Sequence, residues 1–464
     1  MTDLDHQIPC EKEQEEGAYS LDQRLVAAAL DAVDVGDRQR LINLMDPLHA
    51  ADIADILEQI NSFDRRRLVL LYDRKFDGEI LSELDEAIRE EIISVLTTDV
   101  LAGAFRDLES DDIVDIVEDL DEPQQKAILG QLEVADRVAV EKSLSYPEFS
   151  AGRLMQRETV FVPQHWAVGE TIDFLRHADE LPEQFYHVIL VDPRLHPVAN
   201  VTLGKIMSSH RNTLMAQLAE DVFEVIPVIQ DEAEVAYAFN QYHLISAPVV
   251  DSDGRLVGVI TIDDAMAVLD EEHEEDILRL AGVSDDSSLS DTIFVAARGR
   301  ATWLFVNLLT ALMASVVIDL FSETINQMVA LAVLMPIVAS MGGNAGTQTM
   351  TVTVRAMATK DLTAQNALRV IGREISVGAV NGLLFGLITA LVTGFWFGAP
   401  MLAVVIGSAM VLTQLAAAFG GIAIPIALDR TGIDPALASG PLVTTVTDIV
   451  GFFAFLSLAA SILL

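Results

Sequence analysis

The sequence predicts a multidomain membrane protein. In chain order we expect an all-α superhelical N-terminal domain, an α+β tandem domain, a connecting helix and a five-helix α transmembrane domain. The chain has a net charge of −41, although 51% of its residues are hydrophobic. Only 5 Lys or Arg and 7 Asp or Glu lie beyond residue 300, so the first 300 residues hold 24 basic and 63 acidic residues. An acidic, water-soluble part is therefore joined to an apolar, nearly uncharged part.

The negative charge of the soluble part indicates which ligands and partners it can bind. A surface this acidic repels nucleic acid and attracts cations, so no nucleic acid is expected as a partner; a merely solubilising surface is the alternative. Cys10 is the one cysteine, so no intramolecular disulfide is expected. The N-terminus is acidic and lacks an apolar core, so no cleaved signal peptide is expected. The soluble part is predicted to be cytosolic.

The first domain is predicted to be a stack of short helices. Residues 1–20 are polar and are expected to be a disordered acidic N-terminus, whereas 21–150 carry apolar residues at three- and four-residue spacing. The segments "DPLHAADIADILEQI", "DEAIREEIISVL" and "LESDDIVDIVEDL" resemble one another. Helical repeats of this kind stack as a small superhelix. We interpret the acidic run Asp111, Asp112 and Asp115 as a solvated helix face.

Residues 151–270 change to short β-branched runs between helices. "YHVILV" and "APVVDSDGRLVGVITIDDAM" each predict strands followed by a helix, and "DSDG" is typical of a hairpin turn. The two units, about 153–210 and 211–270, resemble a tandem pair of CBS modules. That resemblance implies a regulatory ligand, of which ATP or another adenine nucleotide is the common type.

The ribose-contacting pattern of CBS modules is a threonine followed three residues later by an aspartate. Thr261 and Asp264 match this pattern in the second unit. The first unit has Thr202 and Lys205 at the corresponding positions. The resemblance therefore implies at most one nucleotide pocket of this kind.

Residues 271–300 are predicted to form a helix that connects the soluble part to the membrane. The stretch "LDEEHEEDILRLAG" places five carboxylates within one or two helical turns: Glu271, Glu272, Glu274, Glu275 and Asp276. Like charges at this spacing destabilise an isolated helix, so solvent or a divalent cation shared with another acidic surface must offset the repulsion. A charged connector without a ligand is the alternative.

The last part, 301–464, is predicted to cross the membrane five times, because its apolar segments can each span a hydrocarbon core of roughly 30 Å. These segments lie near 301–321, 326–351, 375–398, 401–428 and 440–464. Basic residues precede the first span and fill the second and fourth connections, whereas the other two connections have none. The positive-inside rule therefore places the N-terminal domain in the cytosol and the C-terminus outside. We expect a multi-pass protein in the lipid bilayer of the inner or plasma membrane.

An acidic side chain, Asp448, lies inside the last span, in "GPLVTTVTDIVGFF". A carboxylate there costs about 2.5 kcal/mol or more, so Asp448 is expected to face a wet cavity or a cation. Hydrogen bonding to neighbouring helices is the structural alternative. Thr444, Thr445 and Thr447 add hydroxyl oxygens nearby, and Thr444 should share the face of Asp448 because it lies one turn earlier.

The second span contains "MPIVASMGGNAGTQ", which is unusual for a membrane helix. Pro336, Gly342 and Gly343 predict a broken helix whose freed carbonyls would line an aqueous path. Asn344 adds a side-chain oxygen at the break. The third span carries glycines every four residues from Gly378 to Gly386, which we interpret as an edge for close helix packing.

The motifs "GGNAGTQ", "VRAMATKDL" and "DPALASGPLVTTVTDIVG", together with the domain order, resemble the MgtE family of magnesium channels. The resemblance covers nearly the whole chain. It implies a homodimer whose pore lies along the two-fold axis, with Mg2+ held by Asp448 and with Asn344 nearby. It also implies that cytosolic Mg2+ binds between the acidic domains and the connecting helix and closes the pore.

The resemblance carries over residue by residue. The regulatory Mg2+ ligands of the family match Asp231, Asp264, Glu272, Glu275 and Asp276. Two further acidic positions of the family are His243 and Ala267 here, and a polar pore position two turns before Asp448 is Gly440. The number of regulatory ions is therefore left open.

The residue types near the membrane acid suit magnesium. Mg2+ prefers octahedral oxygen ligands and gives up water reluctantly, so paired carboxylates would hold the hydrated ion. No His or second Cys accompanies Asp448 in the spans, which argues against copper or zinc but leaves Co2+ and other divalent cations open. The sequence thus predicts a magnesium channel rather than an enzyme.

Three other functions remain open. An intramembrane aspartic protease needs two carboxylates at one site, and the other candidates, Asp319 and Asp434, lie near span ends. An ion-coupled carrier of another solute would also use a broken helix, although five spans do not divide into two equal repeats. A sensor anchored by its spans would leave Asp448 and Asn344 unexplained.

Overall fold

The computed structural model describes residues 21–283 and 293–463, apart from 107, 119, 179, 180, 183, 221, 222 and 364. The chain forms two compact units, Met1–Asp270 and Glu271–Leu464. The N-terminal segment 1–20, expected to be disordered, lies outside the described residues, as does 284–292 of the expected connecting helix.

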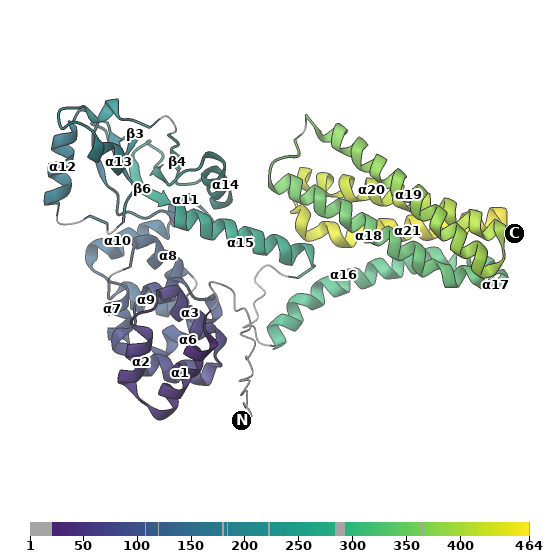
Figure 1. Ribbon diagram of the computed structural model, residues 1–464, viewed down its shortest axis with the longest axis horizontal. Coiled ribbons are helices and arrows are strands. Elements are labelled where there is room, and N and C mark those ends of the chain that lie inside the picture. Colours follow the sequence, from purple (N-terminus) through teal and green to yellow (C-terminus); the bar gives the residue numbers. More distant parts are fainter. Residues whose placement is uncertain are drawn as a thin grey trace, which may run out of the picture. The chain divides into compact units, whose positions relative to one another are not determined.

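The first unit begins with a stack of short helices, purple to blue in Figure 1, as the periodicity predicted. They are α1 (Gln23–Val35), α2 (Arg38–Met45), α3 (Ala50–Gln59), α4 (Ser62–Tyr72), η1 (Asp73–Lys75), α5 (Glu79–Ser82), α6 (Glu86–Val95), α7 (Thr98–Ala104), α8 (Ser110–Glu118), α9 (Glu122–Leu129) and α10 (Val134–Ser143). The three similar segments become α3, α6 and α8. Each buries isoleucines, for example Ile56, Ile92 and Ile116, in one shared core, so the repeat in the sequence is a repeat of buried faces.

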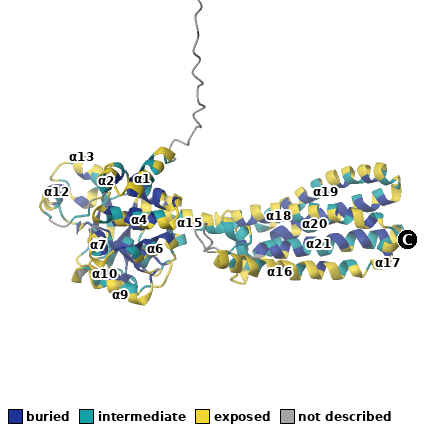
Figure 2. Cartoon of the chain, turned by 90° about the horizontal axis from the view of Figure 1, so that it is seen from below, coloured by how far each residue is buried: buried dark blue, intermediate teal, exposed yellow. Residues whose placement is uncertain are grey.

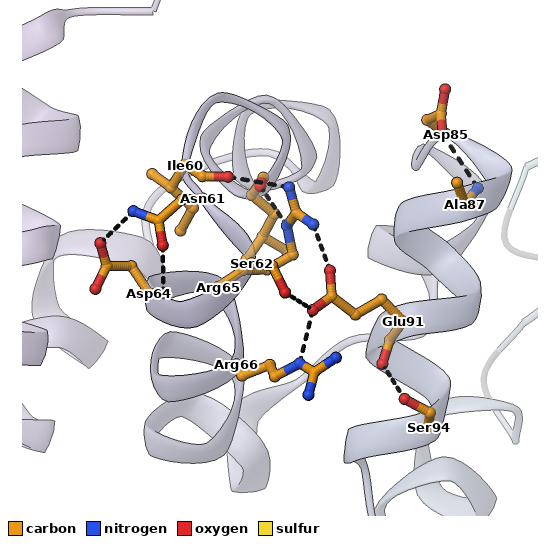
Figure 3. A network of polar contacts seen from close by, with 11 residues as sticks. Ile60, Asn61, Ser62, Asp64, Arg65, Arg66, Asp85, Ala87, Glu91 and Ser94 are labelled. Carbon is orange, nitrogen blue, oxygen red and sulfur yellow. Dashed lines mark hydrogen bonds and ion pairs between the residues drawn. The ribbon is translucent and has the colours of Figure 1, made fainter. Parts of the chain in front are cut away.

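Buried arginines tie successive helices of this stack together. The Arg65 guanidinium donates to Leu57 O at 2.8 Å and Ile60 O at 3.0 Å, where α3 ends and leaves carbonyls without helical partners. The same guanidinium pairs with Glu91 of α6 at 2.5 Å (Figure 3). Arg89 and Asp115 form a second pair, at 2.6 Å, with the same separation of 26 residues along the chain. These pairs therefore repeat with the helices and fix their register.

Replacing Arg65 by Met is expected to destabilise the helical stack by about 3 kcal/mol, because it leaves two buried carbonyls without their donor and leaves Glu91 with Arg66 as its remaining arginine partner. The side chains of Arg65 and Glu91 are 9% and 14% exposed. Hydrogen exchange of α3 and α6 amides in a urea series measures the change. Arg40→Met is the control, because its pair with Asp31 is exposed and should contribute at most about 1 kcal/mol. Equal effects of the two variants would contradict the prediction.

Two three-stranded sheets follow, and they have the same topology. In the first, β1 (Phe161–Pro163) is parallel to β2 (His187–Val191), which is antiparallel to β3 (Pro197–Thr202). In the second, β4 (Ile226–Pro227), β5 (Ser246–Val250) and β6 (Leu256–Thr261) repeat this order. The associated helices are α11 (Ala151–Leu154), α12 (Val168–His177), α13 (Leu203–Ser208), η2 (Met215–Gln217) and α14 (Glu232–Tyr242). The repetition confirms the tandem α+β arrangement.

The connecting helix begins earlier than predicted. We expected it from residue 271, but α15 (Ile262–Leu280) starts directly after β6. Thr261 and Asp264 fix this start, because Asp264 accepts hydrogen bonds from the backbone and hydroxyl of Thr261. The helix is therefore a continuation of the second sheet unit and is not a separate element.

Among its described residues, the second unit has five helices that are long and apolar enough to cross a membrane. These are α16 (Ile293–Asp319), α18 (Ala330–Ala358), α19 (Ala367–Phe397), α20 (Pro400–Arg430) and α21 (Pro435–Ile462), and the short α17 (Ser322–Gln327) precedes α18. Each helix extends beyond its predicted apolar segment at one end or both, because polar residues there remain helical, but α18 starts at residue 330 and not at 326. Figure 2 shows buried residues concentrated in α20 and α21, while α16 is mostly exposed.

The predicted break in the second span is wrong. The helix α18 runs without interruption through Pro336, Gly342 and Gly343. A Cβ on Gly342 would lie 2.6 Å from Thr413 Cγ2, and one on Gly346 would lie 2.7 Å from Val443 Cγ1. These two glycines therefore allow α18 to pack closely on α20 and α21 and do not open the helix.

The glycines of α19 serve the role expected of them. A Cβ on Gly378 would lie 2.9 Å from Gln414 O, and one on Gly386 would lie 2.8 Å from Gly407 O. Backbone atoms of α20 thus occupy the space beside α19, which confirms the close packing of these two helices.

Candidate functional site

The membrane acid lies on α21, where this helix packs antiparallel to α18. The register follows from two glycines: a Cβ on Gly451 would lie 3.3 Å from Val338 Cγ1, and a Cβ on Gly346 would lie 2.7 Å from Val443 Cγ1. Asn344 lies two residues before Gly346, so it is at the same depth as Thr444 and Asp448. Asp448 is half-buried and Asn344 is exposed on this single chain. Adjacent helices therefore carry a carboxylate and an amide at one level of the bundle.

Among the described residues, no side chain forms a hydrogen bond or ion pair with the Asp448 carboxylate. The alternative that Asp448 hydrogen-bonds neighbouring helices thus has no support here. An acid without a protein partner inside an apolar bundle requires water or a cation.

The three nearby threonine hydroxyls all donate to backbone carbonyls but differ in burial. Thr445 Oγ1 donates to Pro441 O at 2.5 Å, Thr447 Oγ1 donates to Thr444 O at 2.9 Å, and both residues are buried. The half-buried Thr444 also donates to backbone, to Gly440 O at 3.1 Å. Of the three threonines, Thr444 thus combines accessibility with the face of Asp448 one turn later.

The acidic run of the connecting helix separates into two faces. Glu272, Glu275 and Asp276 are half-buried and share one face of α15, whereas Glu271 and Glu274 are exposed. Burial and the negative charge of Asp434 raise the pKa of Asp276 above its usual range. The half-buried acids are the three of this run that the family resemblance matched to regulatory Mg2+ ligands; the sequence alone did not distinguish their exposure from that of Glu271 and Glu274.

The end of α15 meets the start of α21. Arg279 Nη2 lies 2.7 Å from Glu275 Oε2, and Arg279 Nη1 lies 3.2 Å from Asp434 Oδ2. The other oxygen of Asp434 accepts from Ala436 N at 2.8 Å and so caps α21. Leu280 packs beside this contact on a cluster that includes Met350. Sequence reasoning missed Arg279 and the role of Asp434, because the two lie far apart in the chain.

A second group of acids lies in the first unit, between α8 and the start of α15. Burial, and then the charge of Asp264, raise the pKa of Asp112 to about 7 and that of Asp111 well above its usual range. Burial and the charge of Glu158 raise the pKa of Glu109 to about 7. Burial raises the pKa of Asp264 itself to about 6. The interpretation of Asp111 and Asp112 as a solvated face is therefore wrong; Asp115 is exposed.

These acids repel one another unless a proton or a cation compensates their charge. In the part of the chain that the structure describes, no three His, Cys, Asp or Glu side chains are already gathered as a metal site. Mg2+ usually keeps several of its waters, so carboxylates can hold it across a water shell without closing around it.

The stability of the first unit without divalent cations is expected to fall as pH rises from about 5 to 8. Folding raises these pKa values, so the folded state binds protons that the unfolded state has lost above its ordinary pKa, and this stabilisation disappears as pH passes about 7. The change should be on the order of 1 to 2 kcal/mol, since solvent screens part of the interaction. Thermal unfolding at pH 5.5 and 8 measures it. Glu109→Gln with Asp112→Asn should flatten the pH dependence, and stability that rose with pH would contradict the prediction.

Of the remaining predicted site residues, Asp231 lies apart from these groups, whereas Thr261 adjoins Asp264 of the second group. Asp231 is exposed and caps α14, accepting from Ala233 N at 3.1 Å. Thr261 and Asp264 bond to each other in the cap of α15. A cavity of about 20 Å3 beside Thr261 is lined also by His187 and Ser246, whose side chains are 2.8 Å apart. This cavity has room for about one water, not for a nucleotide.

Three family models match the chain. A model described as "Divalent cation transporter" matches residues 335–458, "MgtE intracellular N domain" matches 48–149 and "CBS domain" matches 220–271. The first covers most of α21, including Asp448, and the second contains α8.

Curated relatives align with this chain over nearly its whole length. The magnesium transporter MgtE of Thermus thermophilus is 30% identical over 450 residues, which cover 96% of this chain and 99% of that protein. The magnesium transporter MgtE of Bacillus subtilis is 28% identical and covers 90% of this chain and 93% of that protein. A crystal structure of the cytosolic domain of the Mg2+ channel MgtE in complex with ATP has a TM-score of 0.49 and 26% identity, and covers 52% of this chain and 99% of that chain.

The relatives and the five apolar helices together indicate a multi-pass membrane protein with a cytosolic N-terminal domain. An identity of 30% across nearly all of both chains extends from the helical stack to the last span. This chain belongs to the MgtE family of magnesium transporters.

Proposed function

We propose that this chain is a magnesium channel of the inner (plasma) membrane that passes hydrated Mg2+ down its electrochemical gradient. The observation that carries the proposal is the carboxylate of Asp448, half-buried in an apolar helix at the depth of Asn344. Relatives of nearly equal length are named magnesium transporters. Oxygen ligands alone suit Mg2+ and also admit Co2+ or other hard divalent cations as secondary cargo.

The pore is proposed to lie between two copies of the chain, on the axis of a homodimer. A single carboxylate is a weak site for a hydrated divalent ion, and a two-fold axis doubles it. Asn344 is exposed on the single chain, at the level of Asp448. A second copy against this face would enclose the carboxylates, amides and Thr444 hydroxyls of both chains. The C-terminus is proposed to lie outside the cell, as five spans require.

Cytosolic Mg2+ is proposed to close the pore by binding at the acidic sites. Glu272, Glu275 and Asp276 form the half-buried face of α15, and Asp276 lies beside the cap of α21. Asp264 lies in the buried acidic group of the first unit, and Asp231 adds an exposed carboxylate. Without Mg2+ these acids repel their neighbours; with Mg2+ the repulsion is removed and the compact form is favoured.

ATP or another adenine nucleotide is proposed as a ligand of the second CBS unit, at Thr261 and Asp264. The cavity beside Thr261 is small, so binding requires the His187 and Ser246 side chains to separate. The first CBS unit is not proposed as a nucleotide site, since Lys205 stands where the pattern has an aspartate.

Two other functions are less well supported. A protease needs a second carboxylate beside Asp448, yet Asp434 lies 14 residues earlier, about 21 Å along a helix. Asp319 ends α16 and is also remote in sequence. A carrier built on a broken helix loses its support, because α18 is continuous.

The test is Mg2+ entry into liposomes that contain the purified protein, followed with a magnesium-sensitive dye. Channel activity predicts entry down a gradient, without any coupling ion and without cleavage of added membrane peptides. Entry equal to that of protein-free liposomes, or entry that requires a proton or sodium gradient, would overturn the proposal.

A further inference from the structure

The contact between Arg279 and Asp434 joins the connecting helix to the last membrane helix. We infer that Arg279 is a positioning residue, through which movement of α15 reaches the pore helix α21. The inference rests on the proposed function for its transport readout, and on the geometry of the second unit alone for its structural readout.

The geometry places Arg279 between two carboxylates on different helices. Its Nη2 lies 2.7 Å from Glu275 one turn earlier, and its Nη1 lies 3.2 Å from Asp434 at the start of α21. The Arg279 side chain is 20% exposed, so solvent screens the contact less than it screens a surface pair. A guanidinium can hold two carboxylates at once in a fixed plane. Arg279 therefore fixes the distance between the end of α15 and the first turn of α21.

The partner of Arg279 sets where α21 begins. Asp434 uses one oxygen for Arg279 and the other for Ala436 N, at 2.8 Å. A pull on its carboxylate therefore acts on the first turn of the helix that carries Asp448 14 residues later. Leu280, adjacent to Arg279, packs on a cluster that includes Val443, one turn before Thr447. An apolar contact and an ion pair thus transmit the same displacement.

The charges that face Arg279 explain why an arginine is needed. Glu275, Asp276 and Asp434 surround it, and His273 also acts on Asp276. Without a cation the three carboxylates would repel and separate α15 from α21. A divalent ion bound to α15 could replace part of this attraction, but it would not specify the planar two-carboxylate contact. Arg279 therefore keeps the helices connected whether or not the acids hold metal.

The experiment measures inhibition of Mg2+ entry by Mg2+ on the cytosolic side. Arg279→Gln should raise the inhibitory concentration roughly fivefold or more, in the range usual for coupled sites, with entry at low inhibitory Mg2+ unchanged. Arg279→Lys should restore much of the sensitivity. Asp434→Ser keeps a helix cap but loses the charge, and should match Arg279→Gln without adding to it in the double variant. Arg430→Gln, an exposed charge at the end of α20, is the control and should change nothing.

Hydrogen exchange separates this inference from the proposed function. Amides of the first turn of α21 should exchange faster in Arg279→Gln than in the parent, with or without Mg2+ and whatever the protein transports. Unchanged exchange there would overturn the inference, as would unchanged or tighter inhibition by Mg2+. A parent protein that passes no Mg2+, combined with faster exchange in the variant, would overturn the proposed function and leave the connection between α15 and α21 standing.

Discussion

Replacing Asp448 by alanine is expected to abolish Mg2+ entry into liposomes, with a loss of roughly 100-fold or more. One carboxylate about 5 Å from a divalent ion contributes about 7 kcal/mol at an effective dielectric of 20, and an ion on the dimer axis would feel two of them. Losing about 3 kcal/mol of this stabilisation in the narrowest part of the path already slows passage about 100-fold. The measurement is the initial rate of dye response per reconstituted protein.

Two further variants separate charge from packing at this position. Asp448→Asn has the shape of the parent side chain but no charge, so it should be nearly as defective as the alanine variant. Asp448→Glu keeps the charge and should retain part of the rate. All three should elute as the parent does from a sizing column. An alanine variant that fills liposomes at the parental rate would show that the ion does not pass this carboxylate.

Neutralising the half-buried acidic face of α15 is expected to remove inhibition by cytosolic Mg2+. The triple variant carries Glu272→Gln, Glu275→Gln and Asp276→Asn. It no longer gains stability from bridging ions when its domains close. A shift from 1% to 99% closed requires about 5.5 kcal/mol of differential binding, so losing three shared ligands should leave the channel open over the whole concentration range. The measurement is entry rate against Mg2+ on the cytosolic side.

A matched triple variant controls for the change in net charge. Glu83→Gln, Glu86→Gln and Asp99→Asn remove three exposed acids from the helical stack. These changes should leave inhibition by Mg2+ as it is in the parent. If the α15 variant remained inhibited at the parental concentration, the regulatory ions would have to bind elsewhere. Equal loss of inhibition in both triple variants would point to bulk charge as the cause.

Features that depend on a single continuous segment could be predicted from the sequence. The five apolar helices follow from local length and hydropathy, although their ends extend into polar residues such as Arg430. The helical stack follows from a repeat of buried isoleucines. The tandem sheets follow from β-branched runs and one hairpin turn, in which Gly254 adopts a positive φ of 77°. Each of these signals is complete within about 30 residues.

The glycines show where sequence reasoning about the candidate site failed. Gly342 lies in a stretch that could open a helix or pack one closely, and both outcomes use a missing Cβ. A Cβ on Gly342 would lie 2.6 Å from Thr413 Cγ2 of α20, so the structure decides for packing. Asp111 is a second example. A run of charged residues predicts an exposed helix face, but in the structure Asp111 is buried and lies near Asp264, which is far along the chain.

By itself, the sequence determined the membrane topology class, the acidic character of the soluble part and the family of this chain. Only the tertiary structure decided that α18 is continuous, that Asp111 of α8 is buried and that Arg279 meets Asp434. The physical reason is the distance along the chain between the residues that interact. Hydropathy and helix periodicity are sums over neighbouring residues, whereas burial, ion pairing and close packing depend on atoms contributed by segments that are remote in the chain.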